Sequence, residues 1–151
     1  MGSHLREVFF LVGEGDVVLW SDASESPVRL PDTRARWEAI WSRRERIVEI
    51  AHSHPIGPIA FSREDETTMR ALVTALGRPV LFSVVAPDGM IRRVEPVDEP
   101  GAGEDRRARL VEDEPWWTRL LRLASGMQET SRTTDLARAV AAPSEIATKE
   151  Q

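Results

Sequence analysis

The chain has 151 residues, 41% hydrophobic and 30% charged, with a formal net charge of −5. This length and hydrophobic fraction suit one domain with its own core, and the negative balance gives no general attraction for nucleic acid or an anionic membrane. The absence of cysteine excludes a disulfide scaffold and a thiolate metal site. We find no apolar run near the roughly 20 residues of a membrane span and no signal peptide, so we expect a cytoplasmic protein.

The N-terminal part of the chain predicts a β-hairpin followed by a helix. Residues 1–4 read Met-Gly-Ser-His and are set aside as an expression scar. Two apolar runs at 8–12 and 17–20 flank a Glu-Gly-Asp tripeptide at 14–16, which is typical of a hairpin. Asp32 is the expected N-cap of a helix that carries three apolar side chains on one face, namely Trp37, Ile40 and Trp41.

The next segment predicts a strand that ends in two histidines. Residues 46–53 read RIVEIAHS, and this run predicts a strand over 47–53. Side chains two positions apart on a strand point to the same face, so His52 and His54 project together. The residues that follow break the strand and force a loop, namely Pro55, Gly57 and Pro58.

A helix over 63–76 follows this loop. Ser62 stands at its N-cap and Asp65 three residues on, which is close to a capping box. The helix carries an apolar stripe with spacing i, i+3, i+4 and i+7, and it ends at Gly77; the stripe consists of Met69, Leu72, Val73 and Leu76. Two histidines and one carboxylate are ligands that a catalytic zinc takes while keeping a fourth position for water. The spacing therefore predicts that His52, His54 and Asp65 bind Zn²⁺.

The rest of the chain predicts two more strands and a C-terminal helix. Residues 79–86 and 90–94 read as strands joined by a Pro-Asp-Gly turn. Strands interleaved with helices predict an α/β fold with a mixed β-sheet between helices. We divide the chain into a domain at 5–97, an acidic linker at 98–114, a helix at 115–127 and a polar tail at 128–151. Trp116 and Trp117 are expected to pack this helix onto the domain.

The motif His-Ser-His-Pro followed by Ser-x-x-Asp resembles the signature of the JAMM (MPN-plus, or JAB) zinc metalloproteases of the bacterial type. The resemblance implies a cytidine-deaminase-like α/β domain in which His52, His54 and Asp65 hold Zn²⁺. It further implies that Ser62 helps to stabilise the tetrahedral intermediate. Phe61 stands where family members often have proline.

The family also needs an upstream glutamate, which takes a proton from the metal-bound water and passes it to the leaving amine. Glu7 precedes an apolar strand that ends near Gly13, one residue closer than the usual spacing. Glu14 is a rival, although it lies at the predicted hairpin tip. Glu49 lies on the strand face opposite the two histidines. We therefore choose Glu7 as the catalytic glutamate.

The family usually has a helix before this glutamate, and the sequence here has almost nothing before Glu7. Either the sequence is trimmed before Glu7 or this helix is missing. A missing helix would leave one sheet face partly bare, so another element would have to cover it. The helix predicted at 115–127 is our candidate for this cover.

The resemblance implies a zinc isopeptidase or peptidase that removes a ubiquitin-like or sulfur-carrier protein from its conjugates. In bacteria some such enzymes accompany antiphage conjugation systems, and others process sulfur carriers. An extended, glycine-ended tail commonly pairs with a sheet edge, and we expect residues 80–85 to form walls of its groove. The partner is thus a protein conjugate, with no nucleic acid and no membrane.

Two alternatives remain. RadC-like proteins carry a similar His-x-His-Pro-x-Gly segment, which Gly57 matches, but their usual N-terminal helix-hairpin-helix region is absent here. A non-catalytic scaffold of the MPN-minus type is the other alternative. Such relatives have usually lost a ligand, whereas this chain keeps all of them.

Overall fold

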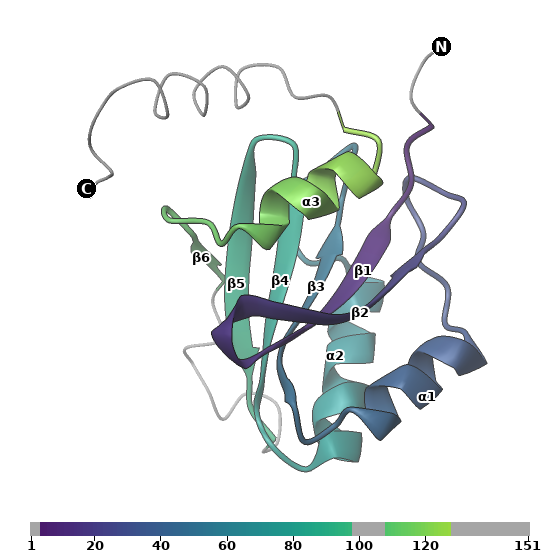
Figure 1. Ribbon diagram of the computed structural model, residues 1–151, viewed down its shortest axis with the longest axis vertical. Coiled ribbons are helices and arrows are strands. Elements are labelled where there is room, and N and C mark those ends of the chain that lie inside the picture. The colour runs from purple at the N-terminus through teal and green to yellow at the C-terminus, as the bar shows by residue number, and fades with distance from the viewer. Residues whose placement is uncertain (1–3, 98–107, 128–151) are drawn as a thin grey trace.

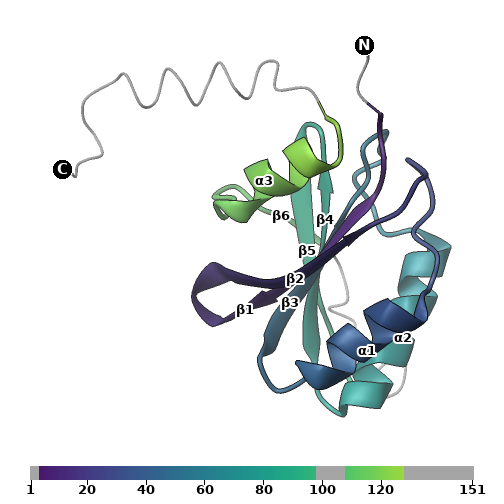
Figure 2. The same ribbon diagram turned by 45° about the vertical axis from the view of Figure 1, so that its right-hand side comes forward.

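A central β-sheet with helices on both faces organises the chain (Figures 1 and 2). The structure, a computed structural model, describes residues 4–97 and 108–127. In chain order its elements are β1 (Val8–Gly13), a 3-10 turn (Glu14–Asp16), β2 (Val17–Ala23), α1 (Arg34–Ser42), β3 (Ile47–Ser53), α2 (Arg63–Leu76), β4 (Val80–Ala86), β5 (Gly89–Glu95), β6 (Arg109–Leu110) and α3 (Trp117–Ala124).

The sheet has the strand order β2-β1-β3-β4-β5-β6, and β3 with β4 forms its parallel pair. The other neighbouring strands are antiparallel. Figure 2 shows α1 and α2 on one side of the sheet and α3 on the other. The predicted α/β class with a mixed sheet between helices is confirmed.

The predicted hairpin forms β1 and β2, with β2 reaching Ala23 rather than residue 20. Its turn includes Gly15 with a φ of 73°, a left-handed conformation that glycine adopts without steric penalty. Antiparallel pairing with both β2 and β3 places β1 inside the sheet. This position explains why all six residues of β1 are buried.

The first helix begins one residue later than predicted. Thr33, not Asp32, is the N-cap, because its side chain accepts a hydrogen bond from the Arg36 N–H at 3.1 Å. The buried face is also shifted, since Trp41 is 53% exposed. The buried Arg36 instead pairs with Asp22 of β2 at 2.8 Å, and a pattern that counts only apolar residues misses such a pair.

The second helix has the predicted bounds and caps. Ser62 is its N-cap and Gly77, with a φ of 72°, its C-cap. Met69, Leu72 and Val73 are buried in the core cluster under α1 and α2, and Leu76 packs against it. The long apolar stripe was therefore sufficient to place this helix on the sheet.

The third helix, predicted at 115–127, covers the opposite face of the sheet. Trp117 and Leu121 of α3 are fully buried in a cluster with strand residues, which are Val8, Phe10, Val12, Ala51, Val85 and Met90. Trp117 packs as predicted, but Trp116 does not, since it is 60% exposed. The helix thus covers the face that we expected to be bare.

One prediction about the later strands needs correction. Arg109 and Leu110, assigned to the acidic linker, form β6, which pairs with β5; residues 98–107 of that linker lie outside the described residues. Residues 80–85, expected to form walls of the substrate groove, belong to β4, and Phe82 of this strand lines the cavity beside the histidines. β4 is hydrogen-bonded to β3 and β5 on its two sides. Its backbone therefore cannot pair with a substrate tail.

Residues 1–3 of the predicted scar and the predicted tail at 128–151 also lie outside the described residues. Within the described part of the chain, we find no helix of the length and apolarity that crossing a bilayer requires.

The two neighbouring tryptophans give a matched test of the α3 packing. Trp117→Ala should lower the free energy of unfolding by about 3–5 kcal/mol, because it leaves a cavity in the core. Trp116→Ala should lower it by less than about 1 kcal/mol, because that ring is mostly in solvent. Urea unfolding followed by circular dichroism measures both values. Equal losses would show that α3 does not pack through Trp117.

Candidate metal centre

The two histidines lie at the carboxyl end of β3, in the middle of the sheet. His52 pairs with Phe9 of β1 on one side and with Val84 of β4 on the other. His54 follows the strand and donates its backbone N–H to the Val85 carbonyl at 2.9 Å. Neighbouring strands thus hold the backbone of both residues.

The loop after the strand fixes the ring of His54. Its Nδ1 lies 2.9 Å from the Pro58 carbonyl oxygen. Because a carbonyl only accepts hydrogen bonds, Nδ1 is the donor in this contact, and Nε2 is the ring nitrogen that faces the site. Gly57, at a φ of 85°, allows the tight turn that brings this carbonyl back to the ring. This is the usual way in which a metal-binding histidine is oriented.

The N-terminus of α2 fixes Asp65. The Ser62 N–H donates to Asp65 Oδ2 at 2.8 Å, and the Asp65 N–H donates to Ser62 Oγ at 3.0 Å. The predicted near-capping box is thus a complete one. It holds the Asp65 carboxylate in one orientation.

Three potential ligand side chains converge at this point. His52 Nε2 lies 3.1 Å from His54 Nε2 and 3.2 Å from Asp65 Oδ1, and His54 Nε2 lies 3.3 Å from Asp65 Oδ2. With bonds of about 2.0 Å, neighbouring ligands of a tetrahedral zinc stand about 3.3 Å apart. The two histidine nitrogens lie near this spacing, and each of them lies near it from one oxygen of Asp65, so the three side chains suit a shared zinc ion.

The charges of the cluster favour an ionised carboxylate. Burial raises the pKa of Asp65, but hydrogen bonds from His52, His54 and the Ser62 N–H outweigh it and hold this pKa far below its usual range. Burial lowers the pKa of His54, but the hydrogen bonds to Asp65 and Pro58 outweigh it, so this pKa is raised. A divalent cation can take the place of the proton that each histidine ring shares with Asp65, because a metal-bound histidine is neutral.

A second carboxylate faces the same histidines. Glu7, 5% exposed, precedes β1 and hydrogen-bonds through its backbone to Ser24 and Ser26. One ligand atom from each of Glu7, His52 and His54 lies within 4.8 Å of the others. Burial raises the pKa of Glu7, against the opposing effect of the two histidines.

The two rival glutamates are placed elsewhere. Glu14 is exposed at the hairpin tip, beyond the end of β1 that pairs with Ile47. Glu49 is buried, and both its carboxylate oxygens accept from Arg92, at 2.8 and 3.0 Å. Of the three glutamates, Glu7 is the one that the fold brings to the histidines.

A cavity of about 920 Å³ opens beside the cluster. It is bounded by the loop before α1 and by the start of α2, and Ser62 lies in its wall. Its apolar lining includes Phe9, Leu30, Pro31, Trp37, Pro58 and Phe61. The candidate ligands thus border a space that admits another molecule.

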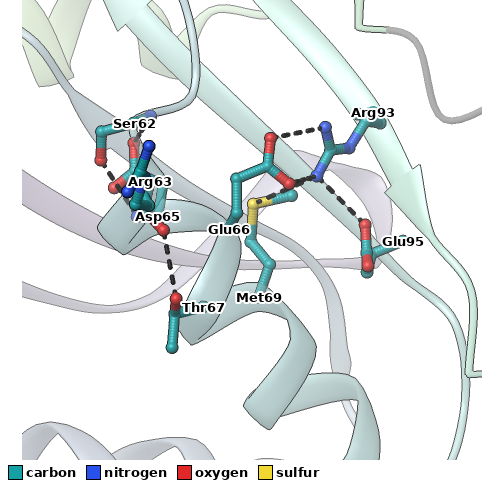
Figure 3. A network of polar contacts seen from close by, with 8 residues as sticks. All are labelled: Ser62, Arg63, Asp65, Glu66, Thr67, Met69, Arg93 and Glu95. Carbon is teal, nitrogen blue, oxygen red and sulfur yellow. Dashed lines mark hydrogen bonds and ion pairs between the residues drawn. The ribbon is translucent and has the colours of Figure 1, made fainter. Parts of the chain in front are cut away.

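Sequence reasoning missed the contacts that brace the start of α2. Arg93 of β5 donates to both carboxylate oxygens of Glu66, at 2.6 and 3.1 Å, and to Glu95 at 3.1 Å (Figure 3). Its guanidinium also lies 5.0 Å from the centre of the Phe61 ring. Glu66 and Phe61 flank the Ser62–Asp65 capping box, so Arg93 supports it from the sheet. Nothing in the local sequence pairs Arg93 with α2.

A mixed α/β domain with two histidines at the end of its central strand and an aspartate in the first turn of the next helix is the arrangement of a JAB/MPN-like domain. A family model described as prokaryotic homologs of the JAB domain matches residues 10–97. The chain belongs to this family, and the resemblance drawn from the motif is confirmed. No curated protein matches the chain.

The buried Glu7 should make the metal-free protein less stable at neutral pH. Folding raises the pKa of Glu7, so the folded protein is favoured while this side chain is protonated. That contribution to the free energy of unfolding is present at low pH and is lost as the pH rises through the pKa of Glu7 in the folded state. Glu7→Gln should therefore raise the Tm of chelator-treated protein at about pH 7.5, and much less at about pH 4. Exposed Glu14→Gln is the control. A lower Tm for Glu7→Gln at the higher pH would contradict the prediction.

Proposed function

We propose that the protein is a zinc-dependent isopeptidase or peptidase. The observation that carries the proposal is the convergence of His52, His54 and Asp65 at 3.1–3.3 Å, with a buried glutamate facing them. Membership of the prokaryotic JAB family supports it, because the family includes metalloproteases.

In this proposal His52, His54 and Asp65 hold the metal and Glu7 is the general base. Zinc, when bound, lowers the pKa of a bound water toward about 7 and polarises the carbonyl to be attacked. Asp65 suits the ligand role because its Oδ1 lies 3.2 Å from His52 Nε2 and its Oδ2 lies 3.3 Å from His54 Nε2. Glu7 accepts the proton of the attacking water and returns it to the leaving amine, and its raised pKa suits it to both steps.

Ser62 is assigned to the oxyanion. Its Oγ accepts a hydrogen bond from the Asp65 N–H, which leaves its own proton free to donate. The residue also lines the cavity next to the candidate ligands. A donor held by a helix cap is pre-organised for a negative charge that develops during the reaction.

The proposed substrate is a ubiquitin-like or sulfur-carrier protein joined through its C-terminal glycine, either in an antiphage conjugation system or in sulfur-carrier processing. JAMM enzymes cut at such a glycine, and the cavity beside the ligands offers apolar walls for an extended tail. Pairing with β4 is excluded, so the tail would have to use an outer strand. Of the two outer strands, β2 ends closer to Glu7, because its last residue, Ala23, pairs with Val8.

The first test is the metal content of tag-free protein. Mass spectrometry should find about one zinc per chain in the wild type and almost none in Asp65→Ala, because two histidines alone form an open, weak site. Glu64→Ala, the exposed neighbour on the same helix, should keep its zinc. No zinc in wild-type protein purified without chelator would favour the non-catalytic scaffold.

The second test separates metal binding from turnover. Glu7→Gln should keep its zinc but cleave glycine-ended linear fusions of ubiquitin-like and sulfur-carrier proteins at least about 100-fold more slowly, because the general base is lost. Gel-based cleavage rates measure this, with Glu14→Gln as the control that should cleave at the wild-type rate. If Glu14→Gln cleaves slowly while Glu7→Gln cleaves at the wild-type rate, Glu14 is the general base.

A further inference from the structure

The segment that carries Glu7 is tied to the end of α3. Arg6 donates its backbone N–H to the Ser125 carbonyl at 3.1 Å and its Nε–H to the Ala124 carbonyl at 3.0 Å. Gly126 packs so closely on this segment that a Cβ there would lie 2.5 Å from the His4 carbonyl oxygen. Figure 1 shows the C-terminal end of α3 beside the chain that leads into β1.

Two buried hydroxyls continue this connection into the sheet. Ser125 Oγ and Ser53 Oγ lie 2.6 Å apart, and both residues are 0% exposed. Ser53 Oγ accepts the Val8 N–H at 2.9 Å, while Ser125 Oγ lies 2.7 Å from the Leu121 carbonyl. Each hydroxyl has one proton. A chain from Val8 N–H through Ser53 and Ser125 to Leu121 therefore uses every donor once.

This chain of hydrogen bonds reaches both halves of the candidate metal centre. Ser53 stands between the two histidines in sequence, and Val8 follows Glu7 directly. Both neighbours of Glu7 are thus fixed by hydrogen bonds. Arg6 is bound to the C-terminal end of α3, and Val8 is bound to Ser53, which contacts Ser125. Both Glu7 and α3 lie outside the matched segment 10–97.

We propose that Ser125 and Ser53 are positioning residues, through which α3 holds Glu7 against His52 and His54. The proposal rests on the function proposed above, in which Glu7 is the general base. It makes α3 part of the framework of the active site and not only a cover for the sheet. A hydroxyl that merely stabilises α3 would instead act equally on the whole fold.

Thr118 provides the matched control for that distinction. Its hydroxyl is buried at the start of α3, whereas Ser125 is the C-cap of this helix. Thr118 is 4% exposed and bonds the Pro115 carbonyl at 2.8 Å and Glu114 at 3.3 Å. These contacts lie at the N-terminal end of the helix and do not lead to Glu7. Thr118→Val and Ser125→Ala each remove one buried hydroxyl from the same helix.

The experiment compares amide hydrogen exchange at residues 6–8, measured by NMR on the metal-free full chain. Ser125→Ala should speed exchange at Val8 about tenfold relative to Thr118→Val, because Ser53 loses the partner that holds it under that amide. The visible spectrum of bound Co²⁺ is the second readout. Ser125→Ala should change it in the same direction as Glu7→Gln, and Thr118→Val should leave it as in the wild type.

Wild-type exchange at Val8 in Ser125→Ala, with a fall in Tm equal to that of Thr118→Val, would overturn the proposal. Ser125→Thr, which keeps the hydroxyl, should restore slow exchange. If Ser125→Ala does not fold, Ser53→Ala tests the same chain, since it removes the acceptor of the Val8 N–H; unchanged exchange at Val8 in that variant would also overturn the proposal. Exchange needs neither metal nor substrate, so its result stays distinct from a failure of the proposed hydrolysis.

Discussion

The reciprocal hydrogen bonding of Ser62 and Asp65 is the constraint on which the candidate site depends. A capping box satisfies backbone N–H groups that the start of a helix leaves unpaired. Here the capping carboxylate also faces two histidine rings at 3.2 and 3.3 Å. The interaction that starts α2 is therefore the one that points Asp65 at the end of β3, so the helix cannot shift without displacing a candidate ligand.

The sheet supplies the other half of this geometry. β3 lies between β1 and β4, so the histidines follow a strand that is hydrogen-bonded on both sides. β1 starts directly after Glu7 and runs beside β3, which brings this acid to the same end of the sheet. Arg93 links α2 back to β5. The site thus stands on elements that hold one another in place.

Features with a local physical cause could be predicted from the sequence. The two-residue period of a strand is enough to predict that His52 and His54 lie on the same face. A cap residue, an apolar stripe and a glycine are enough to predict the bounds of α2. The start of α1 was wrong by one residue because Asp32 and Thr33 are both good caps. Local chemistry did not decide between them.

Features that depend on distant partners could not be predicted. The burial of Arg36 depends on its ion pair with Asp22, fourteen residues away. Residues 109–110 form a strand because they hydrogen-bond to β5. Trp116 and Trp117 are the same residue type at neighbouring positions. The direction of α3 across the sheet buries Trp117 and exposes Trp116. Glu7 was chosen over Glu14 from the expected hairpin, and its burial depends on the same long-range packing.

The tie between α3 and Glu7 explains how the segment that leads into β1 is held in place. In the proposed function Glu7 is the general base, which must stay within hydrogen-bond reach of its water. Here β1 is an inner strand, and the residues on either side of Glu7 are hydrogen-bonded to α3 or to Ser53. Burial of Glu7 opposes its ionised form, so a flexible segment would turn this side chain toward solvent. The hydrogen bonds on both sides of Glu7 keep its side chain buried. In our proposal α3 therefore positions Glu7, in addition to packing on the sheet.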